Sequence, residues 1–155
     1  MAAIKRLELR LVTGDRTDAG TDGDVFLGVG GREYNVDSRG DVNDHERNAD
    51  RRYVFGENST VLNPSENDPR TPWQTETEDL FATPMYIRIE PGDGGDWNIE
   101  LAQLTVVDDS NNSITFDRLR GSSNLWLGER RGKYLYFRTP RHATGPGGVP
   151  GPLNG

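Results

Sequence analysis

An acidic, glycine-rich stretch at residues 13–26, TGDRTDAGTDGDVF, holds the side chains of this sequence best suited to chemistry. Carboxylates alternate there with glycines, and the residues concerned are Asp15, Asp18, Asp22, Asp24, Gly14, Gly20 and Gly23. Carboxylate and backbone oxygens on a flexible loop are the ligands that a hard cation such as Ca²⁺ takes. The stretch is not an EF-hand, because Val29 stands where the closing glutamate should be. Calcium binding here would therefore require other loops to converge on this one.

Short strands are the elements that would position this loop. Residues 7–11 and 25–29 alternate apolar and other residues, a period of two that is typical of half-buried strands. Gly30-Gly31 predicts a tight turn into the next strand. Strands are expected at 7–11, 25–29, 32–36, 52–55, 84–90, 98–107, 113–117 and 133–138. Strands at this spacing, without a long amphipathic helix or an internal repeat, predict an all-β antiparallel sandwich.

The composition fits one domain rich in turns. The chain has 155 residues, 32% of them hydrophobic, with 19 glycines and 9 prolines. No apolar run approaches the roughly 18 residues that span a bilayer, and the amino terminus lacks the apolar core of a signal peptide. We therefore expect either a cytoplasmic chain or the mature part of a secreted one. The absence of cysteine excludes disulfides and thiolate metal sites.

The net charge of −7 is concentrated in one quarter of the chain. Residues 13–50 hold ten acids against four arginines, which accounts for −6 of the total. No basic stripe opposes a phosphate backbone, so nucleic acid is not an expected partner. An anionic membrane would repel this face unless cations neutralised it.

Two segments stand apart from the expected strands. Residues 56–80 form a long polar insertion, and loops of this length are usually functional or mobile. Residues 138–155 contain nine Gly or Pro among eighteen, so we expect a tail without packed elements. The predicted organisation is a sandwich over residues 4–137, interrupted at 56–80 and followed by this tail.

Four motifs in order along the chain carry a resemblance to a known family. They are TGD with AGTD at 13–22, YNVD continuing to NDHER at 34–47, YIRI at 86–89 and WNIE at 97–100. Together they are similar to PLAT/LH2 domains, the C2-like modules of lipoxygenases, lipases, polycystins and clostridial phospholipase-C toxins. The resemblance implies an eight-stranded antiparallel C2-like β-sandwich with Trp97 in its core. His45 stands where the family has an aromatic residue.

The resemblance also implies a Ca²⁺ site at one end of the sandwich, formed by three loops. The implied ligands are Asp18, Gly20, Thr21 and Asp22 in the first loop, Asp37, Gly40, Asn43 and Asp44 in the second, and Asp93 or Asp96 in the third. The residues alone favour the same grouping, because all three segments are acidic turns that follow expected strands. The alternative is that these Asp and Asn residues only satisfy turn geometry. Zinc is disfavoured, because His45 and His142 are the only histidines.

Two further tryptophans are candidates for contact with a membrane or a partner. Trp73 lies between Pro72 and Gln74 in the insertion, where it either covers a sheet edge or anchors at an interface. Trp126 lies in the apolar triplet at 125–127, which is consistent either with an exposed tip or with a short strand that enters the core. The run around Tyr134 and Tyr136 reads as an ordinary strand.

The sequence offers no catalytic constellation. It has no cysteine and no G-x-S-x-G elbow, and its clustered acids lie in turns that are better explained as metal ligands. We therefore expect a non-catalytic calcium-binding module that docks on a membrane or lipid surface. One alternative is a protein–protein adaptor in which calcium is structural or absent. Another is a carbohydrate binder that uses Trp73 or Trp126 as a stacking platform. The oligomeric state stays open.

Overall fold

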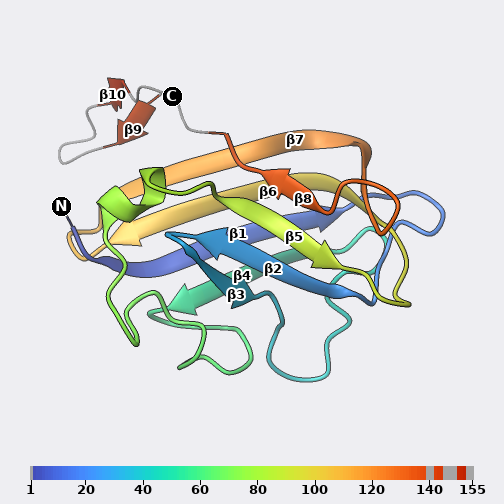
Figure 1. Cartoon of the computed structure of the whole chain (residues 1–155), viewed down its shortest axis with the longest axis horizontal. Helices are drawn as coiled ribbons and strands as arrows, with labels where there is room; N and C mark the ends of the chain where they lie inside the picture. Colours follow the sequence, from blue (N-terminus) through green and yellow to red (C-terminus); the bar gives the residue numbers. More distant parts are fainter. Residues whose placement is uncertain (1, 139–141, 145–149, 153–155) are drawn as a thin grey trace.

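Two antiparallel four-stranded sheets face each other in the computed structural model of the chain (Figure 1). The structure describes residues 2–138, 142–144 and 150–152. The strands of the sandwich are β1 (Ile4–Thr13), β2 (Asp24–Val29), β3 (Arg32–Asn35), β4 (Asp50–Gly56), β5 (Tyr86–Glu90), β6 (Trp97–Asp108), β7 (Ser113–Leu127) and β8 (Tyr134–Tyr136). The predicted antiparallel β-sandwich is confirmed.

The first sheet has the order β4-β1-β6-β7. Its register pairs Leu9 of β1 with Tyr53 of β4 on one side and with Leu104 of β6 on the other. The pairing of β6 with β7 shifts twice, between Ile99 and Leu101 and between Ala102 and Gln103. Such bulges increase the local twist of a strand pair. In β7 the chain stays extended as far as Leu127, well beyond the predicted end at residue 117.

The second sheet has the order β3-β2-β5-β8. The predicted turn between β2 and β3 is present, with Gly30 and Gly31 at φ of 61° and 83°. These angles favour glycine, because a side chain would clash with its own backbone there. β8 is the short outer strand of this sheet and pairs with β5.

The core lies between the two sheets and is built from the inward-facing residues of both. The alternation of Leu7, Leu9 and Leu11 buries all three side chains, as their spacing predicts. Trp97, at the start of β6, is fully buried, and its Nε1 donates a 2.8 Å hydrogen bond to Oγ1 of Thr13. The predicted core position of Trp97 is therefore confirmed.

Two short strands lie beyond the sandwich, β9 (His142–Thr144) and β10 (Pro150–Pro152), and they pair with each other. The predicted count of eight strands is wrong for the described chain, because this hairpin adds to the strands of the sandwich. The expectation of a tail without regular elements also fails at these two segments. The rest of the tail, at 139–141, 145–149 and 153–155, lies outside the described residues.

The insertion at 56–80 is packed onto the sandwich. Val61 and Thr75 are buried, and the guanidinium of Arg32 donates to the carbonyl oxygens of Asp68 (3.0 Å) and Thr71 (2.8 Å). A short 3-10 helix, η1 (Thr77–Phe81), leads from the insertion towards β5. The insertion is thus part of the domain's structure. Over the described ranges of the chain, no helix has the length and apolar character to cross a membrane.

Candidate metal site

Three loops meet at the end of the sandwich opposite η1 (Figure 1). The first loop (14–23) joins β1 to β2, the second (36–49) joins β3 to β4, and the third (91–96) joins β5 to β6. The backbone N–H of Thr21 donates to the carbonyl of His45 (2.9 Å), and that of Asp22 donates to the carbonyl of Gly94 (3.1 Å). The first loop is therefore bonded to both of the others, as the sequence predicts.

Glycine makes this close approach possible. A Cβ atom on Gly94 would lie 2.3 Å from the backbone nitrogen of Gly23, and one on Gly20 would lie 2.9 Å from the carbonyl oxygen of His45. Distances this short exclude any side chain. The hydroxyl of Thr21 closes the contact by donating to the carbonyl of Gly95 at 2.8 Å. Gly20 and Thr21 thus fasten the loops to one another.

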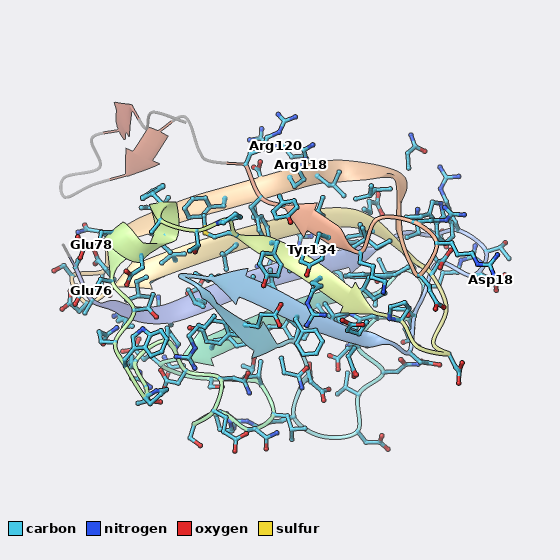
Figure 2. The ribbon with its side chains drawn as sticks, viewed as in Figure 1. Asp18, Glu76, Glu78, Arg118, Arg120 and Tyr134 are labelled. Carbon is cyan, nitrogen blue, oxygen red and sulfur yellow. The ribbon has the colours of Figure 1, made fainter. Side chains whose placement is uncertain are left out.

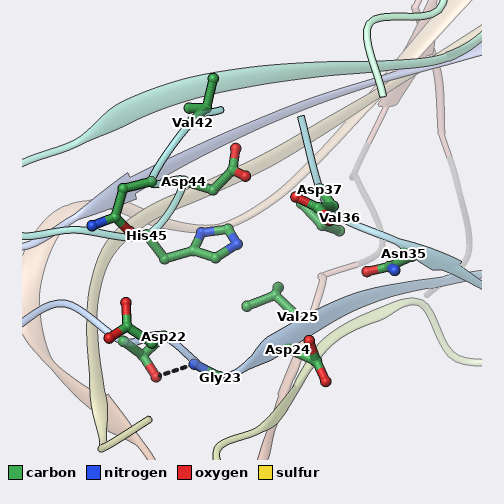
Figure 3. Close-up of a pocket in the computed structure, with 12 residues that line it drawn as sticks. Asp22, Gly23, Asp24, Val25, Asn35, Val36, Asp37, Val42, Asp44 and His45 are labelled. Carbon is green, nitrogen blue, oxygen red and sulfur yellow. Dashed lines mark hydrogen bonds between the residues drawn. The ribbon is translucent and has the colours of Figure 1, made fainter. Parts of the chain in front are cut away.

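A pocket of about 210 Å³ opens between the first and second loops (Figure 3). Carboxylates line it from both sides, Asp22 and Asp24 from one and Asp37 and Asp44 from the other. Five of the predicted ligands lie on its wall: Thr21, Asp22, Asp37, Asn43 and Asp44. Asp24 is a pocket residue that the predicted ligand set does not include. The predicted pairing of β2 with β3 could have indicated Asp24. The N–H of Val36 donates to the carbonyl of Val25, which brings the neighbouring residues Asp24 and Asp37 to the same place.

Asp44 is fixed in place by three donors. Ser38 donates to its carboxylate through Oγ (2.6 Å) and through its backbone N–H (3.2 Å), and the hydroxyl of Tyr53 donates at 3.1 Å. Burial raises the pKa of Asp44, but these hydrogen bonds and the neighbouring His45 outweigh it and hold the pKa below its usual range. Asp44 is therefore the most firmly oriented carboxylate of the pocket.

Asp37 faces Asp44 across the second loop (Figure 3). Burial raises its pKa, and so do the hydrogen bond and charge of Asp44 and the charge of Asp24. A raised folded-state pKa means that protonation of Asp37 favours folding, and this contribution is lost as the pH rises through that pKa. Once ionised, Asp37 and Asp44 repel each other at short range. A cation between them would relieve that repulsion.

The imidazole of His45 points into the same pocket (Figure 3). The ring is buried against Trp97, with centroids 5.1 Å apart, and burial lowers its pKa, so His45 is neutral at physiological pH. A hydrogen bond to the carbonyl of Val36 orients the ring, and Nε2 has no partner within the described residues. His45 therefore packs as an aromatic side chain against the core residue Trp97.

The other five predicted ligands do not line the pocket. Gly20 belongs to the backbone contact between the loops, and the remaining four lie elsewhere. Asp18 is exposed at φ 59°, Gly40 is exposed at φ 82°, and Asp93 is exposed on the third loop. Asp96 forms an ion pair with Arg131 (3.2 Å), and its carboxylate occupies the space that a side chain on Gly128 would need. The third loop thus contributes carbonyl groups that accept hydrogen bonds from the first loop. Asp96 instead turns towards the loop between β7 and β8.

The donor set of the pocket suits calcium better than zinc. Among the described residues, no cluster of three or more His, Cys, Asp or Glu side chains is close enough to hold a metal ion. Two adjacent carboxylates, an asparagine and backbone carbonyls are nevertheless oxygen donors, and Ca²⁺ completes such sets with water. The residues present are consistent with a calcium site that uses few side chains.

The two candidate contact tryptophans differ in exposure. Trp73 is 55% exposed, with the guanidinium carbon of Arg32 5.9 Å from its ring centre. Trp126 lies within β7 and is half-buried, with Arg131 above its ring at 5.2 Å. The reading of residues 125–127 as part of a strand is therefore the correct one. Of the two, only Trp73 presents a largely free indole.

Two packed antiparallel sheets with converging acidic loops at one end define a C2-like β-sandwich. More narrowly, the chain has a PLAT/LH2-like fold, as comparison with solved structures shows. It matches the alpha toxin of Clostridium absonum at 20% identity and a TM-score of 0.57, over 88% of this chain and 32% of that one. It also matches coral 8R-lipoxygenase, described as calcium-activated through a C2-like domain, at 16% identity and a TM-score of 0.50.

The coral match covers 85% of this chain and 16% of the lipoxygenase. The alpha toxin of Clostridium perfringens is similar at 17% identity, with a TM-score of 0.50 over 87% of this chain and 31% of the toxin. The chain therefore spans about a third of the toxins and about a sixth of the lipoxygenase. No protein-family model and no curated protein matches it.

Proposed function

We propose that the chain is a non-catalytic, calcium-dependent module for binding a lipid surface. The observation that carries this proposal is the acidic pocket. Asp22, Asp24, Asp37 and Asp44 gather there, and no Lys or Arg of the described chain forms an ion pair with any of them. Like charges brought together without a counter-ion destabilise the fold unless a cation is bound.

The residues of the pocket would divide the work. Asp37 and Asp44 would supply carboxylate oxygens and Asn43 its side-chain amide oxygen, while Asp22 and Asp24 would add negative charge from the first loop. Bound Ca²⁺ supplies positive charge that neutralises the acidic end. Because the loops are bonded together through Thr21 and Gly94, ordering one of them would order the others. The neutralised end could then approach anionic headgroups.

Calcium titration with vesicle sedimentation tests this function directly. We expect saturable binding to chelator-stripped protein with a Kd between micromolar and millimolar, and a raised Tm. Vesicles of phosphatidylserine and phosphatidylcholine should sediment the protein only when calcium is present, and phosphatidylcholine vesicles should serve as the control. Binding that persists in excess chelator would contradict the proposed role of calcium.

Replacing Asp37 with asparagine separates affinity from stability. We expect Asp37→Asn to raise the free energy of unfolding in chelator by up to about 1 kcal/mol, because it removes the repulsion with Asp44. The gain should appear as the pH rises through the raised pKa of Asp37 and vanish at lower pH. Calcium affinity should fall at least about tenfold, since a charged ligand is lost.

Asp41→Asn is the matched control, because Asp41 is exposed on the same loop and does not line the pocket. It should leave both the affinity and the stability unchanged. Equal loss of calcium affinity in the two variants would place the ion elsewhere.

The adaptor alternative retains one supporting observation, the exposed indole of Trp73 on a packed insertion. Because Val61 and Thr75 of this insertion are buried, deleting the whole segment would disturb the fold. If calcium binds but vesicles do not, the surface around Trp73 is the place to seek a protein partner.

A further inference from the structure

Three tyrosines gather on the outer face of the second sheet. Tyr86 of β5 pairs directly with Tyr136 of β8, and the neighbouring outward pair is Arg88 with Tyr134. Tyr134 and Tyr136 are 46% and 51% exposed, and their rings are parallel to within 8° with centroids 5.8 Å apart. Both rings meet the ring of Tyr86 edge-on, at 5.1 and 6.0 Å. Large aromatic side chains left this open on one face are typical of a binding surface.

This face lies away from the acidic end. In Figure 2, Tyr134 lies on the broad side of the sandwich, whereas Asp18 lies at the tip of the loops. The tyrosine face, defined as Tyr86, Tyr134 and Tyr136 with Glu33 and Arg88, shares no residue with the lining of the candidate metal pocket. The sequence predicts only an ordinary strand around Tyr134 and Tyr136, because periodicity alone does not show which outward-facing residues cluster.

The tyrosine face is held rigid from below. Gly28 on β2 lies beneath Tyr86, and a Cβ atom there would fall 2.3 Å from the tyrosine ring, so the ring lies directly against the strand. The hydroxyl of Tyr86 donates to Glu33 at 2.7 Å, and Arg88 donates to both oxygens of Glu33 at 2.8 Å. Arg88 also covers the ring of Phe26 at 4.4 Å. A surface with few free rotamers loses little entropy when a ligand binds.

The charges on this face are already matched. Arg88 forms ion pairs with Glu33 and with Glu90, so its charge is compensated by neighbours on the same face. An anionic ligand would meet these two glutamates, and a cationic one would meet Arg88. The hydroxyls of Tyr134 and Tyr136 make no hydrogen bond within the described chain. Free hydroxyls, aromatic faces and balanced charges complement a neutral ligand that carries many hydroxyl groups.

A groove extends the tyrosine face beyond Tyr136. A hollow of about 430 Å³ begins at Tyr136 and runs along the segment after η1; it is lined by Leu80, Phe81, Ala82, Thr83, Pro84, Met85, Tyr136 and Phe137. Phe81 is exposed on its wall and packs against Phe116 from below. A cavity of this volume suits more than a single sugar ring.

From this geometry we propose that the tyrosine face and its groove bind a neutral oligosaccharide. The apolar faces of its pyranose rings stack on Tyr134 and Tyr136, and its hydroxyls bond to the tyrosine hydroxyls. Calcium takes no part in this contact, because none of the residues of the tyrosine face lines the acidic pocket.

Affinity electrophoresis of the whole chain tests the proposal. The probes are native gels containing a soluble mixed-linkage β-glucan, a galactomannan, a xylan or a dextran, each run with a chelator. We expect at least one polysaccharide to slow the protein. The double variant Tyr134→Ala, Tyr136→Ala should weaken that retardation at least about tenfold, because both stacking faces are lost. The variant with phenylalanine at both positions should keep the stacking and lose only part of the affinity.

Leu62→Ala is the matched control, since Leu62 is an exposed apolar side chain remote from this face in the sequence and outside its lining. It should leave the retardation unchanged, and all variants should keep the parent's Tm. Retardation by none of the four polysaccharides would overturn the proposal, as would undiminished retardation of the alanine double variant. Self-association that depends on the tyrosines, seen by gel filtration, would assign the face to a second copy of the chain instead. Since the gels contain chelator, these outcomes are independent of calcium-dependent vesicle binding.

Discussion

Replacing Trp97 with alanine is expected to lower the free energy of unfolding by about 3–5 kcal/mol. Trp97 is fully buried where the two sheets and the second loop meet, packed against the ring of His45. The substitution leaves a cavity and also deprives the buried hydroxyl of Thr13 of its indole donor. A loss of this size is a large fraction of the 5–15 kcal/mol that stabilises a typical domain.

Urea unfolding followed by far-ultraviolet circular dichroism measures this effect. Trp97→Phe should cost less than the alanine variant, because it fills most of the cavity and loses only the hydrogen bond to Thr13. Trp73→Ala is the control for the loss of an indole, since Trp73 is 55% exposed, and it should change stability by less than about 0.5 kcal/mol. Similar losses of stability in Trp73→Ala and Trp97→Ala would contradict the burial of Trp97 in the core at the start of β6.

Asp44→Ala is expected to destabilise the protein by about 2–3 kcal/mol even without calcium. The buried carboxylate accepts hydrogen bonds from Ser38 and from the hydroxyl of Tyr53. Its removal leaves the Tyr53 hydroxyl buried without a partner, and an unsatisfied buried group costs more than an average hydrogen bond contributes. Calcium affinity should be lost in the same variant, because Asp44 is the best-oriented carboxylate of the pocket.

The pH dependence of stability distinguishes this role from simple repulsion. Since the pKa of Asp44 is lowered in the folded state, its contribution is present above the unfolded-state pKa and is lost as the pH falls through the folded-state pKa. The difference in stability between the parent and Asp44→Ala should therefore shrink on acidification. Asp41→Ala, exposed on the same loop, should cost less than about 0.5 kcal/mol at any pH. A stability gain in Asp44→Ala would show that repulsion from Asp37 dominates.

The sandwich could be predicted because its strands carry their own pattern. Leu7, Leu9 and Leu11 alternate on one strand, and Gly30-Gly31 encodes the next turn, so local sequence is sufficient there. The extension of β7 to Leu127 was missed, because its second half pairs with the start of β6 across a bulge. That pairing depends on long-range register, which a local pattern does not contain.

The candidate site could be predicted at the level of loops but not of every ligand. Acidic turns at the ends of strands on one side of a sandwich can meet, and the hydrogen bond from the backbone N–H of Thr21 to the carbonyl of His45 joins two of them. The direction of each side chain depends on partners far away in the sequence. Asp96 turns towards Arg131, and Tyr53 reaches Asp44 from a neighbouring strand. Neither partner could be assigned without the fold.

The outer strands of the first sheet have a consequence for how the molecule meets its own copies at high concentration. β4 and β7 form the two edges of this sheet, and an unpaired edge is a template for intermolecular aggregation. β4 carries Arg51 and Arg52, while β7 carries Arg118 and Arg120 beside Gly121 at φ 92° (Figure 2). A charged edge, which in β7 is also bulged, resists the addition of a foreign strand. The same irregularities that hid the second half of β7 from sequence analysis thus protect the sheet from growing.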